Sequence, residues 1–305
     1  MIPKKIKIGD TIGIVSPASI ENISSIEKGI RFFQNKGFNV KEGKHIYDKW
    51  GYFAGSDQSR AEDLMDMFLD DEVNMILCLR GGYGTMRILN YIDFNEISKH
   101  PKIFAGFSDI TVLLNSIYEK SNLITFHSPM LSSNFEDIDT SESFFYALCE
   151  GDKPYSIKNP DGYELKAEID GKAEGELAGG NISLLCSLMG TPYEVDFTDK
   201  ILFLEDIKEE PYKIDRMLTQ LLISGKLEKC KGFVLGQFFD CDAANSDRGF
   251  SLKEVLENRI LSLNKPTFSN FMSGHMYPKL TIPIGAKVSL NFDKLCIDVL
   301  EPVII

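Results

Sequence analysis

The sequence predicts an α/β fold with a mainly parallel sheet for the first half of the chain and a β-rich α+β fold for the second half. Three observations support this prediction. Strand-like and helix-like segments alternate through the first half, which is typical of a parallel sheet with helices on both faces. A polar stretch rich in Gly, Pro, Asp and Lys follows Cys149. The last part of the chain contains strand-like segments without helices between them.

Hydrophobic periodicity and capping residues place the elements of the first half. Gly37 can adopt the left-handed conformation that ends a helix, and Ser56 or Asp57 can cap the next helix. Ligands of such sheets bind at the carboxyl ends of the strands. The expected strands are 11–16, 75–79, 103–105 and 123–126, and the expected helices are 21–36, 59–69, 85–91 and one that begins at Asp109.

The polar stretch separates two predicted domains. We expect a first domain over residues 1–150, a linker over 151–172 and a second domain over 173–305. A chain of 305 residues is long enough for two ordinary domains with separate cores. The expected strands of the second domain are 201–204, 233–237, 280–284, 287–290 and 296–300, and its expected helices are 182–189, 212–224 and 252–261.

Composition excludes several classes of function. The net charge is −12 and the Lys and Arg residues form no basic cluster, so we expect no nucleic-acid partner. No apolar run reaches the length of a signal peptide or a membrane span, so we expect a cytoplasmic protein without membrane contact. The six cysteines form no CxxC pair and the four histidines show no ligand spacing, so we expect reduced thiols and no metal.

Ser108 is the candidate nucleophile. It lies in the segment Gly-Phe-Ser-Asp, residues 106–109, where an apolar strand must turn into an amphipathic helix. At such a corner the hydroxyl projects from the sheet beside free backbone N–H groups at the helix N-terminus, which is the geometry of an acyl-transfer nucleophile. A serine hydroxyl is a poor nucleophile alone, so the hypothesis requires a base and a group that orients the base.

A glycine-rich loop follows the neighbouring strand. In Arg80-Gly-Gly-Tyr-Gly84 the glycines allow the backbone to approach a ligand closely. The loop matches neither the dinucleotide nor the P-loop fingerprint, which leaves an oxyanion hole or a plain turn as its role. The expected oxyanion donors are the backbone N–H groups of Gly82 and Asp109.

Two histidines are candidates for the base, and two carboxylates could orient it. His275 lies in a Gly- and Pro-containing loop just before a strand, and His127 follows the end of another strand. Glu205 and Asp206 end an apolar strand. Successive side chains of a strand point to opposite faces, so at most one carboxylate can face the histidine, and the other is expected to be a charge at the start of the helix near Pro211. Spacing alone leaves that choice open.

Four motifs occur in order along the chain. They are Arg80-Gly-Gly-Tyr-Gly84; Gly106-Phe-Ser-Asp-Ile-Thr111; Phe203-Leu-Glu-Asp-Ile207 with Glu210-Pro-Tyr-Lys-Ile-Asp-Arg216; and Ser273-Gly-His-Met-Tyr-Pro-Lys-Leu-Thr-Ile-Pro-Ile-Gly285. This combination resembles the LD-carboxypeptidase family of serine peptidases. The resemblance begins at Ile-Gly-Ile-Val-Ser-Pro-Ala, residues 12–18, and reaches the C-terminal strands, so it covers nearly the whole chain.

The resemblance implies a Ser-His-Glu triad made of Ser108, His275 and Glu205, with the oxyanion hole as placed above. It also implies a Rossmann-like N-terminal domain, a smaller β-rich swivelling C-terminal domain and a homodimer. The implied activity is hydrolysis of an L-to-D peptide bond, which releases terminal D-alanine from a cytoplasmic murein tetrapeptide in cell-wall recycling, without a cofactor. Arg80 is the candidate cation for the free carboxylate of this muropeptide substrate.

Three other functions are considered. A microcin-immunity-type peptidase would cleave an aminoacyl-nucleotide amide with the same triad, but such relatives tend to be longer and to carry an extra aromatic loop before the glutamate. Here residues 179–205 contain only Tyr193, Phe197 and Phe203 as aromatics, and the one tryptophan, Trp50, lies far upstream. The intact Ser, His and Glu argue against a non-catalytic muropeptide-binding protein. The missing dinucleotide fingerprint argues against a nicotinamide-dependent oxidoreductase.

Overall fold

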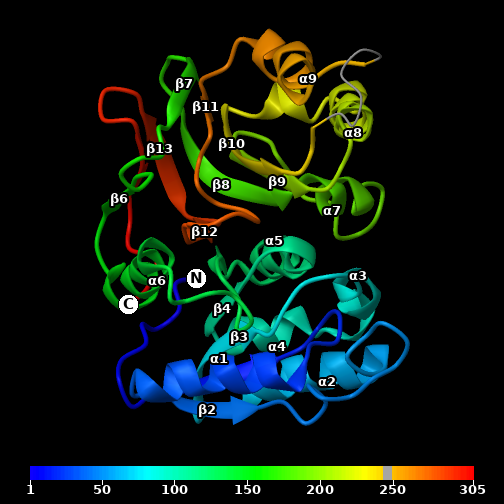
Figure 1. Cartoon of the computed structure of the whole chain (residues 1–305), viewed down its shortest axis with the longest axis vertical. Helices are drawn as coiled ribbons and strands as arrows, with labels where there is room; N and C mark the ends of the chain where they lie inside the picture. The colour runs from blue at the N-terminus through cyan, green and yellow to red at the C-terminus, as the bar shows by residue number, and fades with distance from the viewer. Residues whose placement is uncertain (243–248) are drawn as a thin grey trace. The chain divides into compact units, whose positions relative to one another are not determined.

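The computed structural model describes residues 1–242 and 249–305, which divide into two compact units. Figure 1 shows the course of the chain. Unit 1 comprises Met1–Lys153, Thr281–Gly285 and Pro302–Ile305, and unit 2 comprises Pro154–Leu280 and Ala286–Glu301. This division differs from the expected domains in two respects. Most of the expected linker 151–172 belongs to unit 2, and residues 281–285 and 302–305 return to unit 1.

Unit 1, which lies wholly within the described residues, contains one six-stranded sheet of order β12-β5-β4-β3-β1-β2. Strands β1 to β5 pair in parallel, and β12 pairs antiparallel to β5. The prediction of a mainly parallel sheet is therefore confirmed. The strands are β1 (Thr11–Val15), β2 (Asn39–Glu42), β3 (Val73–Cys78), β4 (Ile103–Gly106), β5 (Thr125–His127) and β12 (Ile282–Ile284).

The helices of unit 1 follow the predicted alternation with two additions. Helix α2 begins where Ser56 accepts a hydrogen bond from the backbone N–H of Ser59, and Gly37 takes φ +89° after α1. Helices α4 and α6 were not expected; each begins at an aspartate whose side chain caps it. The helices are α1 (Ile23–Asn35), α2 (Asp57–Leu69), α3 (Thr85–Ile88), α4 (Phe94–Lys99), α5 (Thr111–Ser121) and α6 (Ile138–Phe145), with short η1 (Leu89–Tyr91), η2 (Ser108–Ile110) and η3 (Tyr146–Glu150).

The described residues of unit 2 form an eight-stranded sheet of order β6-β14-β13-β8-β9-β10-β11-β7. Its centre, β8 to β11, is parallel, and antiparallel strands flank it on both sides. The strands are β6 (Tyr155–Ile157), β7 (Lys166–Ile169), β8 (Glu174–Asn181), β9 (Ile201–Ile207), β10 (Gly232–Phe239), β11 (Thr267–Ser269), β13 (Lys287–Asn291) and β14 (Cys296–Val299).

Helices alternate with the parallel strands of unit 2. Helix α7 (Ile182–Ser187) follows β8, α8 (Pro211–Ile223) follows β9, and α9 (Leu252–Arg259) lies between β10 and β11 in sequence. In Figure 1 the three helices lie together beside the parallel strands. Strands β6 and β7 occupy the expected linker, where their short, exposed sequences gave no apolar run to recognise. The β-rich end of the chain is the antiparallel part, β13 and β14.

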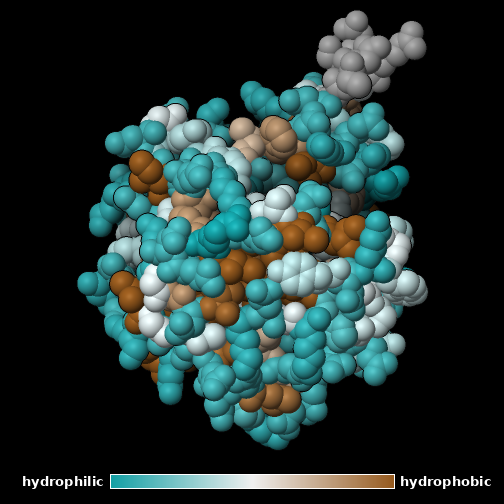
Figure 2. All heavy atoms as spheres, turned by 60° about the horizontal axis from the view of Figure 1, so that its bottom comes forward, coloured by the Kyte–Doolittle hydropathy of each residue, from teal (hydrophilic) through white to brown (hydrophobic). Residues whose placement is uncertain are grey.

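The surface and the chain ends complete the description. Hydrophilic side chains cover most of the face in Figure 2, with hydrophobic residues in smaller patches. Among the described residues, no helix is both long and apolar enough to cross a membrane. All six cysteines are free thiols. The N–H of Lys5 donates to the carbonyl of Ile305 at 2.9 Å, which holds the two chain ends together in unit 1.

We predict that Gly285→Ala destabilises unit 1 through strand β12. Gly285 has φ +90°, and a Cβ there would lie 2.2 Å from ring atoms of Tyr118 on α5. Positive φ costs about 1 kcal/mol, and the steric overlap adds roughly 1 to 3 kcal/mol. Gly162→Ala is the matched control, because Gly162 has φ +89° with nothing within 4 Å of the added Cβ. Thermal unfolding should show a clearly larger loss for Gly285→Ala; equal losses would contradict the packing argument.

Candidate functional site

The backbone of Ser108 is held in a left-handed conformation. Its φ is +63°, directly after β4 and the extended residue Phe107, and it opens the short helix η2. A non-glycine residue rarely adopts this conformation, and such residues concentrate at functional sites. The strand-to-helix corner predicted from the sequence is therefore present, and Ser108 remains partly exposed there.

The loop 80–84 packs directly against Ser108. A Cβ on Gly81 would lie 2.9 Å from the Cβ of Ser108, 3.1 Å from its Oγ and 3.3 Å from the backbone nitrogen of Asp109. Gly82 has φ +112°, and a Cβ there would lie 2.3 Å from the Oγ of Ser19. Both positions therefore require glycine, the first for lack of space and the second for backbone conformation as well.

Asp109 connects η2 to the start of α3. Its buried carboxylate accepts a hydrogen bond from the N–H of Thr85 at 2.8 Å, and the Thr85 hydroxyl donates to the Asp109 carbonyl at 2.6 Å. Burial raises the pKa of the Asp109 carboxyl, and the hydrogen bonds from Thr85 oppose that shift. The Asp109 side chain thus has a structural role. No local pattern in the sequence marks Thr85 as its partner.

Arg80 lies at the start of the same loop and already has polar partners. Its guanidinium donates to the carbonyls of Ile20 at 3.1 Å and Gly81 at 3.3 Å, and it lies 3.7 Å from the carboxylate of Glu21. The nearby Glu21 carboxylate balances part of the positive charge of Arg80. The side chain is about one-third exposed, at 38%.

In unit 2, His275 and Glu205 are in contact. The Nδ1 of His275 lies 2.7 Å from Oε2 of Glu205, which is on β9 and completely buried. An anionic acceptor at Nδ1 fixes the imidazole orientation and places the second ring nitrogen, Nε2, on the opposite side of the ring. Of the two carboxylates that the sequence left open, Glu205 is the one that faces this histidine.

The loop that carries His275 is held by hydrogen bonds on both sides of it. Gln237 accepts from the N–H of Met276 at 2.6 Å and donates to the carbonyl of Pro278 at 3.3 Å. The buried ammonium of Lys279 donates to the carbonyl of Gly274 at 2.8 Å. Burial lowers the pKa of Lys279 to about 8, although Glu205 opposes that shift. Sequence reasoning missed the roles of Gln237, which lies within β10, and of Lys279, which precedes β12, and no local pattern pointed to them.

Asp206 has a structural role that differs from the expected one. It was expected at the start of the helix near Pro211, and this is wrong. Its buried carboxylate instead accepts from the side chain of Asn181 at 2.9 Å and from the N–H and hydroxyl of Ser183 at 3.1 and 2.7 Å, at the start of α7. Burial raises its pKa, and the hydrogen bond from Ser183 opposes that shift. The alternation of side chains along β9 sends it to the face opposite Glu205.

His127, the rival base, lies inside unit 1. It is 1% exposed on β5, opposite Gly106 of β4, and its ring packs edge-on against Phe107 with a centroid separation of 6.0 Å. Its environment is that of a histidine at the edge of the core.

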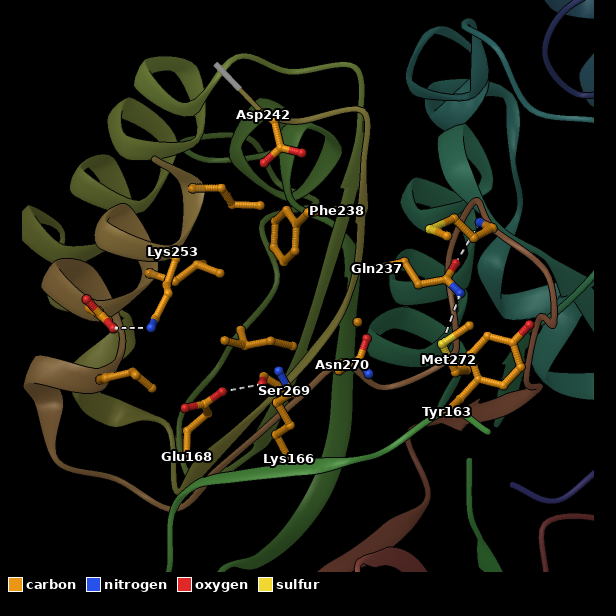
Figure 3. Close-up of a pocket in the computed structure, with 17 residues that line it drawn as sticks. Tyr163, Lys166, Glu168, Gln237, Phe238, Asp242, Lys253, Ser269, Asn270 and Met272 are labelled. Atoms are coloured by element: carbon orange, nitrogen blue, oxygen red, sulfur yellow. Dashed lines mark hydrogen bonds and ion pairs between the residues drawn. The ribbon is translucent and has the colours of Figure 1, made fainter. Parts of the chain in front are cut away.

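A cavity of about 620 Å³ lies in unit 2 next to the His275 loop (Figure 3). Met272, Met276 and Gln237 form one wall, and Gln237 is the residue that also holds the loop. Lys166 and Glu168 line another part, where Ser269 donates to Glu168. Among the described residues, no group of His, Cys, Asp and Glu side chains has the arrangement of a metal site.

Two family models match the chain. The LD-carboxypeptidase N-terminal domain matches residues 12–128, and the LD-carboxypeptidase C-terminal domain matches residues 174–290. The chain belongs to the LD-carboxypeptidase family. The resemblance inferred from the four motifs is confirmed, and with it the two-domain α/β fold. The family is one of hydrolases, which agrees with the acyl-transfer chemistry inferred from Ser108.

Relatives and solved structures cover nearly the whole chain. The probable murein peptide carboxypeptidase of Bacillus subtilis is 44% identical over 293 residues, or 95% of this chain and 91% of the relative. The structure of muramoyltetrapeptide carboxypeptidase from Oxalobacter formigenes has a TM-score of 0.85 at 30% identity and covers 94% of this chain and 97% of that one. The structure of MccF in complex with glutamyl sulfamoyl guanosine has a TM-score of 0.92 at 27% identity and covers 100% and 99%.

We predict that Ser108→Gly is more stable than Ser108→Ala by about 1 kcal/mol, because glycine adopts positive φ without the penalty that Cβ imposes. Both variants lack the hydroxyl, so the difference between their free energies of unfolding reports the cost of the positive φ at residue 108. Chemical denaturation of the two proteins, side by side, measures it. Equal midpoints would show that the left-handed backbone of Ser108 carries no strain.

We predict a pH-dependent stability difference between the wild type and Lys279→Met. The folded pKa of about 8 lies below the ordinary lysine pKa of 10.5 in the unfolded state, so the unfolded state binds more protons between these values and wild-type stability rises with pH there. Relative to the variant, the wild type should gain roughly 2 to 3 kcal/mol from pH 8 to pH 10.5. Unfolding at a series of pH values checks this, and a pH-independent difference would contradict it.

Proposed function

We propose that this protein is a serine carboxypeptidase that hydrolyses the L-to-D peptide bond before the terminal D-alanine of a murein tetrapeptide. The observation that carries the proposal is the 2.7 Å contact between His275 Nδ1 and the buried Glu205 carboxylate. Such a contact prepares an imidazole to act as a general base through its other nitrogen. The left-handed corner at Ser108 supplies the second half of the argument, a hydroxyl presented for attack.

In the proposed mechanism, His275 Nε2 accepts the proton of Ser108 while Oγ attacks the scissile carbonyl. The tetrahedral oxyanion is stabilised by the backbone N–H groups of Gly82 and Asp109, each worth about 3 to 4 kcal/mol in comparable sites. The imidazolium then protonates the leaving amine, and D-alanine departs. Water, activated by the same imidazole, releases the acyl group and restores Ser108.

Glu205 fixes the imidazole and stabilises its charged form. An imidazolium that forms in the first step is attracted by the adjacent carboxylate, and the low dielectric constant of a buried site strengthens that attraction. Gln237 accepts a hydrogen bond from the N–H of Met276 and Lys279 donates one to the carbonyl of Gly274, and both bonds hold the His275 loop in place. These contacts reduce the motion needed when the proton is transferred.

The substrate assignment draws on the relatives. The Bacillus subtilis protein is named a probable murein peptide carboxypeptidase, and the Oxalobacter formigenes protein a muramoyltetrapeptide carboxypeptidase. A carboxypeptidase must recognise a free carboxylate, and Arg80 beside the oxyanion loop is our candidate for that contact, after exchange of its Glu21 partner. We expect the protein to act in the cytoplasm, as a homodimer, in cell-wall recycling.

A microcin-immunity-type activity is the second candidate, because the TM-score of 0.92 to MccF supports it. MccF is solved with an aminoacyl sulfamoyl nucleoside. Two features of the connection from α7 to β9 argue against this activity in the present chain. The connection is short, and its aromatic residues, Tyr193 and Phe197, include no tryptophan. We therefore place the cell-wall peptide first.

The test is digestion of murein tetrapeptide followed by mass analysis for loss of one alanine. Wild type should release alanine, whereas Ser108→Ala, His275→Ala and Glu205→Gln should lower kcat by about 10³-fold or more. His45→Ala and Glu210→Gln, both outside the site, are matched controls for the loss of a histidine and of a carboxylate and should retain activity. Full activity of Glu205→Gln, or no release by the wild type while the aminoacyl sulfamoyl nucleoside is cleaved, would overturn the proposal.

A further inference from the structure

Arg60 is a charged side chain in the interior of unit 1. It lies on α2, which packs against α3 (Figure 1), and it is only 1% exposed. Its guanidinium lies 4.8 Å from the ring centroid of Phe53, which is buried as well. Burying an ion is costly unless its partners compensate, so the contacts that this guanidinium makes indicate what it is retained for.

The Arg60 guanidinium bridges two backbone segments. Its Nη1 donates to the carbonyl of Gly84 at 3.0 Å and also to the carbonyl of Pro17, and its Nη2 donates to the carboxylate of Asp57. Gly84 ends the glycine-rich loop just before α3, and Pro17 lies in the segment that follows β1. One planar group therefore holds the end of the loop and the segment beside it in a fixed relation.

The segment after β1 in turn holds the middle of the loop. The N–H of Tyr83 donates to the Oγ of Ser19 at 3.1 Å, and the N–H of Ser19 approaches the carbonyl of Gly81 at 3.4 Å. A Cβ on Gly82 would lie 2.3 Å from the same Oγ. Gly82, the proposed oxyanion donor, is thus fixed on both sides by a segment that Arg60 holds.

Two carboxylates balance the two guanidiniums of this region. Asp57 binds Arg60 and also Arg87 of α3, whose guanidinium contacts both of its oxygens at 2.9 and 2.8 Å. One carboxylate cannot neutralise two cations, and the second negative charge that acts on Arg60 is that of Asp109. Burial raises the pKa of Asp109, and the charge of Arg60 is among the influences that oppose this shift. Arg60 therefore also acts on the residue that supplies the second proposed oxyanion donor.

We propose that Arg60 is a positioning residue for the oxyanion hole. It holds the loop 80–84 at its end and through the neighbouring segment, so that the N–H of Gly82 is directed at the developing oxyanion, and it does not touch the substrate itself. The oxyanion exists only after Ser108 has attacked, so the effect of Arg60 falls on kcat and not on KM. This inference rests on the proposed function and adds a residue to its machinery.

The first experiment measures kcat and KM of Arg60→Lys with murein tetrapeptide. Lysine keeps the buried charge but lacks the planar fork, so it cannot serve both carbonyls in the same geometry. We expect kcat to fall about 10- to 100-fold while KM stays within about twofold, because a small misplacement of the donors has an effect of this size. Arg60→Met, which removes the cation altogether, should lower kcat at least as far; if it does not fold, Arg60→Lys alone decides.

Lys102→Met is the matched control for the loss of a buried cation. Lys102 is 8% exposed and donates to the carbonyls of Met67, at 3.0 Å, and Asp70, at the far end of α2 from Arg60. Its replacement should lower the unfolding temperature, as replacement of Arg60 does, but leave kcat within about twofold of the wild type. All assays are run at a temperature at which circular dichroism shows every variant to be folded.

The second experiment does not depend on the peptide substrate. A fluorophosphonate forms an ester with the Oγ of Ser108 as fluoride leaves, and its phosphoryl oxygen takes the place of the oxyanion. The rate of labelling therefore reports on the oxyanion hole directly. Arg60→Lys should slow labelling about tenfold or more, whereas Lys102→Met should not.

A double-mutant cycle tests whether Arg60 acts through the carbonyl of Gly84. Gly84 has φ +136°, and a Cβ there would lie 2.8 Å from Nη1 of Arg60 and 2.8 Å from the ring of Phe53. Gly84→Ala therefore disturbs the same contact from its other partner. The two substitutions together should lower kcat little more than the stronger one alone. Losses that multiply would show that Arg60 acts by another route and would overturn the proposal.

The outcomes separate this inference from the proposed function. If the wild type does not cleave the tetrapeptide but is labelled at Ser108, and Arg60→Lys slows the labelling, the proposed function fails and the positioning role stands. If Arg60→Lys loses stability as Lys102→Met does but keeps the wild-type kcat and labelling rate, Arg60 is a structural residue only. The inference is then overturned, and the proposed function stands.

Discussion

The positive φ of Ser108 is the constraint around which unit 1 is arranged. It costs about 1 kcal/mol for a residue with a Cβ, and it is retained because its surroundings leave no alternative. Gly81 lies too close for any side chain, and Asp109 is bonded through both its carboxylate and its carbonyl to Thr85. The corner therefore depends on glycine next to the nucleophile and on a buried carboxylate behind it. Strand β4, which lies inside the sheet, gives these contacts a rigid base.

In unit 2 the buried carboxylate of Glu205 supports His275, as the buried carboxylate of Asp109 supports the Ser108 corner in unit 1. Removing a carboxylate from water is unfavourable unless polar groups compensate, and the His275 contact is such a group. The same burial acts on Lys279, whose pKa falls to about 8 while it holds the carbonyl of Gly274. Because the pKa of Lys279 is about 8, the charge beside this loop changes with pH above neutrality.

The sequence predicted the parallel sheet and the corner at Ser108, because apolar strands followed by glycine or serine leave a local pattern. Local position left both His275 and His127 as candidates for the base, and the family resemblance favoured His275. Spacing alone could not choose between Glu205 and Asp206, since both lie near the end of the same strand, and the choice of Glu205 came from the family resemblance. The packing of α7 against β9 determines that Asp206 is the one that faces Asn181. Thr85, Gln237 and Lys279 were missed for the same reason. The carbonyl groups that accept from Thr85 and Gln237 lie 24 and 41 residues away, and the one that accepts from Lys279 lies 5 residues away inside a loop; no local pattern marks such hydrogen bonds.

The division of the chain into units limits how the protein can be taken apart. The polypeptide passes between the units four times, at 153–154, 280–281, 285–286 and 301–302, because β12 and the last four residues belong to the first sheet. Truncation at one end cannot isolate either half, and a single proteolytic cut leaves three covalent connections in place. A chimera that exchanges the second half with a relative must therefore choose the origin of β12 separately, since its pairing partner β5 comes from the other parent.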